Sequence, residues 1–126
     1  MHAIDTNVLV RLTVRDNQKQ LAAARVFTEK GAWVSHLVVC ESLWVLTSYY
    51  GFTRAQQRDF VAGLLGNDLL SIHDREAVER ALVKFNTHTK ASFSDCMILE
   101  LARKNGCTPL GTFDAGLSKL DGALKL

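Results

Sequence analysis

Apolar and polar residues follow two periods along the chain, one typical of strands and one typical of helices. Short apolar runs at residues 2–5, 32–36, 69–74 and 108–113 predict four strands. Apolar residues that recur every three or four positions predict helices over residues 6–14, 17–30, 37–50, 54–66, 75–85 and 93–106. Because strands alternate with helices, we expect an α/β fold with a parallel four- to five-stranded sheet and helices on both faces.

Residues that begin or end helices stand at the borders of these segments. Gly51 follows the segment 37–50 and is expected to end that helix. Thr53 is suited to cap the next helix, which runs to Gly66. A loop is expected over residues 86–90, and the tail after residue 114 is expected to form a short helix and an edge strand. No repeat or low-complexity segment interrupts the pattern, so residues 1–126 are expected to form one domain.

Composition narrows the class of protein. The chain has 126 residues, of which 48% are apolar and 22% charged, as in a soluble globular domain. No charge-free apolar run reaches the length of a membrane span, and the first residues lack the pattern of a signal peptide. The three cysteines show no CxxC spacing, which argues against a disulfide framework. We therefore expect a cytoplasmic protein without membrane contact.

Four carboxylates lie where a parallel sheet would gather them. Asp5 ends the first expected strand, and Asp114 follows the fourth. Glu41 lies early in the helix after the second strand, and Asp95 lies in the first turn of the helix before the fourth. Ligands of open α/β sheets bind at the carboxyl ends of the strands, so the four acids are expected to converge there. Each aspartate alone is also compatible with a helix cap.

Glu41 is the only charged side chain between Gly31 and Thr53. A buried carboxylate without a partner costs several kcal/mol or becomes neutral. Two carboxylates about 4 Å apart repel by roughly 4 kcal/mol at an effective dielectric near 20. A divalent cation removes this conflict, and oxygen ligands favour Mg²⁺ or Mn²⁺. Such a cluster suits phosphodiester hydrolysis.

The four histidines, His2, His36, His73 and His88, show neither HxH nor HExxH spacing. They are expected to be ordinary surface or strand-end residues rather than zinc ligands.

The motifs together resemble PIN-domain ribonucleases. They are Asp5-Thr6-Asn7 after the first strand, Glu41 in an apolar helix, FSDCMI at residues 93–98, and Thr112-Phe113-Asp114 after the last main strand. Their order, their spacing and the chain length are most similar to VapC toxins of prokaryotic type II toxin–antitoxin modules. The stretch DTNVLVRLTVRDN followed by QKQLAAARVF is especially similar to that group.

The resemblance implies a Mg²⁺-dependent endoribonuclease that cleaves structured cellular RNA and inhibits translation. In that case Asp5, Glu41, Asp95 and Asp114 would bind the metal, and Thr6, Asn7 and Thr112 would orient acids or water. A homodimer and a small cognate antitoxin protein would be the partners.

One position departs from the family pattern. Many relatives carry a further acid two residues after the last one, where this chain has Gly116. The number of metal ions, one or two, therefore stays open. Two alternatives also stay open: a haloacid-dehalogenase-like phosphatase with Asp5 as nucleophile, although Asn7 stands where its second acid belongs, and a non-catalytic PIN scaffold that acts as an interaction module.

Overall fold

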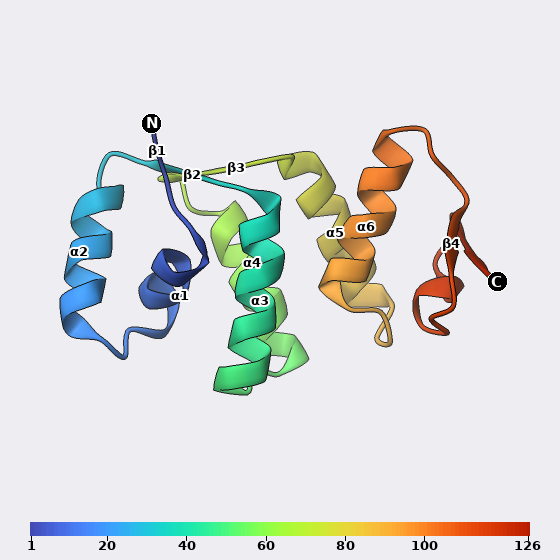
Figure 1. Ribbon diagram of the computed structural model, residues 1–126, viewed down its shortest axis with the longest axis horizontal. Coiled ribbons are helices and arrows are strands. Elements are labelled where there is room, and N and C mark those ends of the chain that lie inside the picture. Colours follow the sequence, from blue (N-terminus) through green and yellow to red (C-terminus); the bar gives the residue numbers. More distant parts are fainter. The chain divides into compact units, whose positions relative to one another are not determined.

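The computed structural model describes all 126 residues, and the chain divides into two compact units, Met1–Arg75 and Glu76–Leu126. The first unit contains β1 (His2–Ala3), α1 (Thr6–Val14), α2 (Gln18–Thr28), β2 (Ala32–Val34), α3 (His36–Tyr50), α4 (Arg54–Leu65) and β3 (Leu70–Ile72) (Figure 1). The second contains α5 (Arg75–Thr87), apart from its first residue, α6 (Phe93–Lys104), β4 (Leu110–Thr112), the 3₁₀ turn η1 (Leu117–Lys119) and β5 (Ala123–Lys125). The expectation of one domain over residues 1–126 stays a prediction.

The sheet of the first unit has the order β1-β2-β3, and both strand pairs are parallel. Along β2 and β3 every second residue is buried, which is the pattern of a strand with one covered face. Ala32 and Val34 are buried, whereas Trp33 between them is exposed. Because the strands are parallel, residues that follow each strand emerge at the same edge of the sheet.

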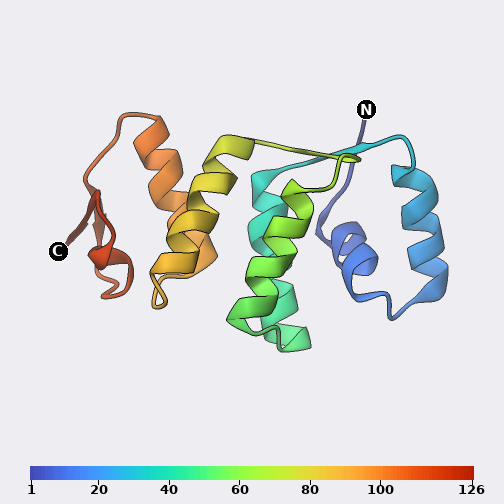
Figure 2. The ribbon, with the colours of Figure 1, turned by 180° about the vertical axis from the view of Figure 1, so that it is seen from behind.

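Helices α1 to α4 cover the buried face of the three-stranded sheet in the first unit. Helix α1 packs against both α2 and α3, and α4 lies behind α3 in Figure 1 and in front of it in Figure 2. Their buried side chains include Leu9, Leu21, Leu46 and Val61. None of the helices in either unit combines the length and the apolar character that crossing a membrane would need.

The second unit is held by the packing of α5, α6 and a two-stranded parallel sheet of β4 and β5. Phe85 of α5 and Phe93 of α6 are buried and meet edge to face, with ring centroids 6.0 Å apart. Leu117 and Leu120 are buried, and they pack the C-terminal segment against β4 and β5.

The α/β class with parallel strands is confirmed, and five strands are present, divided between a sheet of three and a sheet of two. The expected loop over residues 86–90 begins later than predicted, because α5 continues to Thr87. The His88 amide donates to the Lys84 carbonyl and extends the helical hydrogen bonding. All three cysteines are free thiols.

Candidate metal centre

Asp5 lies two residues after the end of β1 and forms the N-cap of α1. Its Oδ1 atom accepts a hydrogen bond from the Val8 amide at 3.1 Å. The side chain is exposed at the carboxyl edge of the sheet and lines a cavity of about 660 Å³ together with Asn7. Thr6 beside it is buried. The capping interpretation of Asp5 is therefore confirmed, and it occupies one of the two carboxylate oxygens.

Glu41 lies in the second turn of α3 and is exposed, so burial by itself does not call for a cation beside it. The same face of α3 carries Leu37 and Trp44, which are 70% and 62% exposed. The apolar run around Glu41 thus does not mean burial, since part of it faces outward. Helix α3 follows β2, which pairs in parallel with β1, so Glu41 and Asp5 belong to elements that leave the same edge of the sheet.

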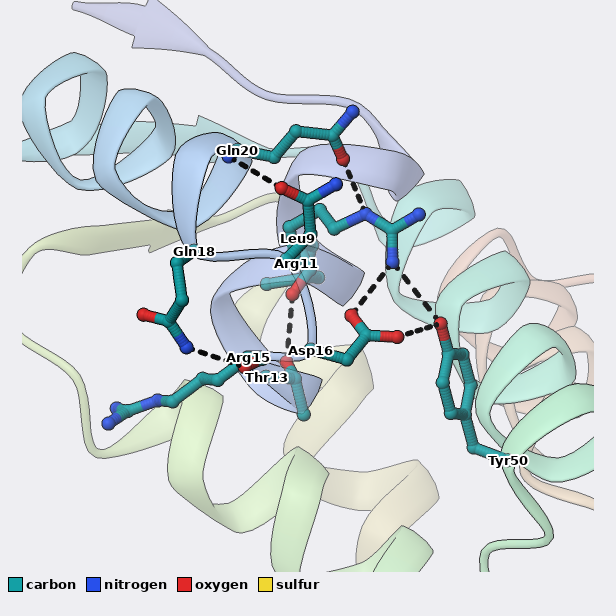
Figure 3. Close-up of polar contacts among 9 residues, drawn as sticks. Leu9, Arg11, Thr13, Arg15, Asp16, Gln18, Gln20 and Tyr50 are labelled. Carbon is teal, nitrogen blue, oxygen red and sulfur yellow. Dashed lines mark hydrogen bonds and ion pairs between the residues drawn. The ribbon is translucent and has the colours of Figure 1, made fainter.

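A polar network centred on Arg11 fixes α1 against α2 and α3 (Figure 3). The Arg11 guanidinium donates to Gln20 Oε1 at 2.6 Å, to Asp16 Oδ1 at 3.0 Å and to the Tyr50 hydroxyl at 3.2 Å. The Tyr50 hydroxyl in turn donates to Asp16 Oδ2 at 3.2 Å. The hydrogen bond that Arg11 donates to Tyr50 raises the pKa of Arg11, and the negative charge of Asp16 acts in the same direction. This network orients α1 and α3, the helices that carry Asp5 and Glu41.

Asp95 and Asp114 lie in the second unit, each at the start of a helical segment. Asp95 is half-buried in the first turn of α6, where its amide donates to the capping Ser92 hydroxyl at 3.1 Å. Asp114 Oδ2 accepts a hydrogen bond from the Leu117 amide at 2.7 Å. The Thr112 hydroxyl accepts from the Asp114 amide at 2.9 Å, so Thr112 orients Asp114 through its backbone.

The turn that carries Asp114 packs against the chain just before α6. A Cβ atom at Gly116 would overlap the Lys90 carbonyl oxygen and lie 3.3 Å from Asp114 Oδ2. This close approach brings Asp114 near the N-terminus of α6, where Asp95 lies. It also means that position 116 has no room for the further acid that the family pattern carries there.

Each pair of acids is therefore defined within its own unit: Asp5 and Glu41 in the first, Asp95 and Asp114 in the second. The convergence of the two pairs on one metal stays a prediction.

A fifth carboxylate, Glu100 on α6, is the buried acid of the chain. It is 3% exposed, and its Oε1 atom lies 3.8 Å from both Lys84 Nζ and Arg103 Nε without a hydrogen bond. The sequence contained a signal that was missed, since Arg103 follows Glu100 at helical i+3 spacing. The positive charges of Lys84 and Arg103 compensate the buried carboxylate, so the structure explains Glu100 without a metal ion.

A second group that sequence analysis did not find contains His36, His73 and Asp74, whose ligand atoms all lie within 4.8 Å of one another. His36 and His73 do lie beyond strand ends, as expected, but the structure brings them together. The missing HxH spacing gave no indication of this, because the two residues meet through the sheet.

The parallel strands and the capping Asp5 are those of an α/β protein, a class whose ligands bind at the carboxyl edge of the sheet. The family described as PIN domain matches residues 3–123, nearly the whole chain. The chain therefore belongs to the PIN domain family. Neither a curated protein nor a solved structure matches it. PIN domains are generally metal-dependent nucleases. Carboxylates that bind a metal ion are suited to that reaction.

Proposed function

We propose that the chain is a Mg²⁺-dependent endoribonuclease in which Asp5, Glu41, Asp95 and Asp114 bind the metal together. One observation carries the proposal beyond family membership: within its own unit, none of these four carboxylates forms an ion pair. Glu100, by contrast, has two cationic partners. Uncompensated acids at helix starts and strand ends are suited to a cation, and a set of oxygen donors alone fits Mg²⁺ or Mn²⁺.

The side chains are held for this role by local hydrogen bonds. The Val8 amide fixes Asp5 through Oδ1, and the Leu117 amide fixes Asp114 through Oδ2. Each carboxylate keeps a second oxygen that the cap does not use. When bound, the ion would lower the pKa of a water molecule and neutralise charge on the scissile phosphate. No protein nucleophile is needed for this hydrolysis.

The proposed substrate is structured cellular RNA, and its cleavage would inhibit translation, as in the toxin of a toxin–antitoxin pair. A small antitoxin protein and a second copy of the chain are the proposed partners. The exposed apolar side chains Leu37, Trp44 and Tyr49 of α3 support contact with another protein chain, since soluble monomers rarely expose such a group together. A cytoplasmic location goes with this role.

Membership in the PIN family argues against the haloacid-dehalogenase alternative, in which Asp5 would be the nucleophile. The non-catalytic scaffold keeps one supporting observation, the closed position at Gly116. The two remaining functions differ in a single measurement, which is metal-dependent cleavage of RNA.

That measurement uses the purified chain with RNA in Mg²⁺ or in EDTA. We expect cleavage in Mg²⁺ and none in EDTA. Glu41→Gln and Asp95→Asn are expected to reduce the rate by more than about 100-fold, because even the loss of a residue that only orients a ligand costs about 10- to 100-fold. Glu29→Gln is the matched control, since Glu29 is exposed and caps the end of α2. Cleavage that survives EDTA would overturn the metal centre.

The toxin role is tested separately, by expression in growing bacteria. We expect growth arrest with the wild-type chain and normal growth with Asp95→Asn. Relief of the arrest by a small protein encoded beside the gene would support the antitoxin. Normal growth with a wild-type chain that cleaves RNA in vitro would contradict the toxin role and leave the nuclease intact.

A further inference from the structure

Three side chains that commonly bind metals meet in the first unit, outside the four acids. Asp74 Oδ2 lies 3.7 Å from His36 Nε2 and 3.7 Å from His73 Nε2. The two imidazole rings stack with centroids 4.6 Å apart and an angle of 12° between their planes. The two nitrogen ligands and the oxygen ligand all lie within 4.8 Å of one another.

The backbone explains why these residues meet. Val34 of β2 is the register partner of Ile72 of β3. His36 begins α3 two residues after Val34, and His73 follows Ile72 directly. The His73 amide also donates to the Val34 carbonyl at 2.9 Å, which extends the strand pairing to the histidine itself. The three side chains therefore come from the first turn of α3 and from the two residues that follow β3.

The backbone of Asp74 supplies a second, independent observation. Its φ angle is 50°, in the left-handed region that residues other than glycine rarely adopt. Such conformations are sparsely populated and cluster at binding sites, where the surrounding structure imposes them. Here the conformation holds the carboxylate between the two imidazoles.

The distances suit a tetrahedral ion. Zinc binds imidazole nitrogen and carboxylate oxygen at about 2.0–2.2 Å, so two ligand atoms of a tetrahedral site lie roughly 3.4 Å apart. The two separations of 3.7 Å are close to this value. The stacked rings must rotate for both nitrogens to face one ion. His73 has room to do so, because its side chain is 45% exposed.

We propose that His36, His73 and Asp74 form a binding site for a divalent transition-metal ion of the zinc type. Imidazole ligands select Zn²⁺, Co²⁺, Ni²⁺ or Cu²⁺ over Mg²⁺, whereas the four acids are all oxygen donors. Three protein ligands leave a fourth position for water or for a group of a bound molecule. The ion joins the start of α3 to the end of β3, and its binding stabilises the first unit by mass action. The inference does not depend on the proposed nuclease activity.

The test measures Zn²⁺ binding to the full chain without an affinity tag, by calorimetry, and Co²⁺ binding by visible absorption. We expect one Zn²⁺ per chain and a Co²⁺ spectrum of a tetrahedral site. His36→Gln, His73→Gln and Asp74→Asn are each expected to weaken Zn²⁺ binding by more than about 100-fold. Asparagine tolerates the left-handed backbone, so Asp74→Asn keeps the fold while it removes the charge.

Matched controls separate this site from other ligands of the chain. His2→Gln and His88→Gln remove the two histidines outside the group and are expected to change the affinity by less than about 3-fold. Cys107→Ser removes the exposed thiol, and Asp5→Asn removes an acid of the nuclease centre; neither should change the stoichiometry. Zn²⁺ binding that is unchanged in the three ligand variants, or lost with Cys107→Ser or Asp5→Asn, would overturn the proposal. Absence of Zn²⁺ binding to the folded wild-type chain in the calorimeter would also overturn it.

Discussion

Asp5 caps a helix and is also a proposed metal ligand, and two substitutions separate these roles. Its Oδ1 atom accepts from the Val8 amide at 3.1 Å. Asp5→Ala removes this acceptor, at a cost of about 0.5–2 kcal/mol in the free energy of unfolding. Asp5→Asn keeps an acceptor and loses only the interaction of the charge with the helix dipole, about 0.3–1 kcal/mol at an exposed site. We therefore expect Asp5→Ala to be the less stable variant and both variants to lose cleavage.

The assay pairs urea unfolding in EDTA with RNA cleavage in Mg²⁺. Asn17→Ala is the matched control, because Asn17 caps α2 by accepting from the Gln20 amide at 3.0 Å. This variant is expected to lose about as much stability as Asp5→Ala and to cleave RNA at the wild-type rate. Mg²⁺ at 100 times its dissociation constant should stabilise the wild-type chain by about 2.7 kcal/mol, and this gain should be absent in Asp5→Asn.

Two results would refute the reasoning. If Asn17→Ala loses cleavage to the same extent as Asp5→Ala, the loss reflects stability rather than the metal. If Asp5→Asn keeps both cleavage and the stabilisation by Mg²⁺, the carboxylate of Asp5 is a cap and nothing more. A wild-type chain that binds RNA but shows neither cleavage nor a Mg²⁺ effect would favour the non-catalytic scaffold.

Two further substitutions test the second unit. Gly116→Asp is expected to lower the free energy of unfolding by about 1–3 kcal/mol, because its Cβ atom would overlap the Lys90 carbonyl, and it should not tighten Mg²⁺ binding. An unchanged melting temperature would show that the turn is not closely packed. Arg103→Met is expected to destabilise more than Glu100→Met, since it leaves a buried carboxylate with one partner; breaking a buried pair costs about 3–5 kcal/mol, and the partial exposure of Arg103 reduces this. Urea unfolding that gives the reverse order would contradict the structural role of the ion pair.

Helix ends were predictable because they depend on side chains a few residues apart. Thr53 and Gln56 form a capping box at the start of α4, as the capping threonine indicated. Gly51 ends α3 with a φ angle of 66°, which a glycine adopts without strain. Both signals are complete within the local sequence, so no knowledge of the tertiary structure was needed.

Strand ends were predicted less well, because they depend on a partner strand far along the chain. The first strand was expected over residues 2–5, but β1 is limited to His2–Ala3. The Ile4 amide still donates to the Trp33 carbonyl at 3.2 Å, whereas Asp5 already serves α1 as its cap. Where the strand ends and the helix begins therefore depends on the partner strand in the fold, and local residue preferences do not decide it.

Burial of the acids was the point at which sequence reasoning failed. The apolar neighbours of Glu41 did not show whether it is buried, and the structure shows that it and several of those neighbours are exposed. Glu100 also stands among apolar residues, Ile98, Leu99, Leu101 and Ala102, yet it is buried. The relation between His36 and His73 was equally hidden, since it arises from the register of β2 on β3. All three depend on which face of an element meets the core.

Capping and metal binding are not competing explanations for the aspartates. The amides at a helix start hold one carboxylate oxygen and favour negative charge, and in a parallel α/β fold these starts lie at the ligand-binding edge. Amide hydrogen bonds thus hold the Asp5 and Asp114 carboxylates where a cation is expected, and Asp95 lies in the first turn of α6, which Ser92 caps. Glu41 has no cap to make and no ion pair in its unit, so the fold alone gives no reason for it. Its substitution by Gln is therefore the most direct test of the metal centre.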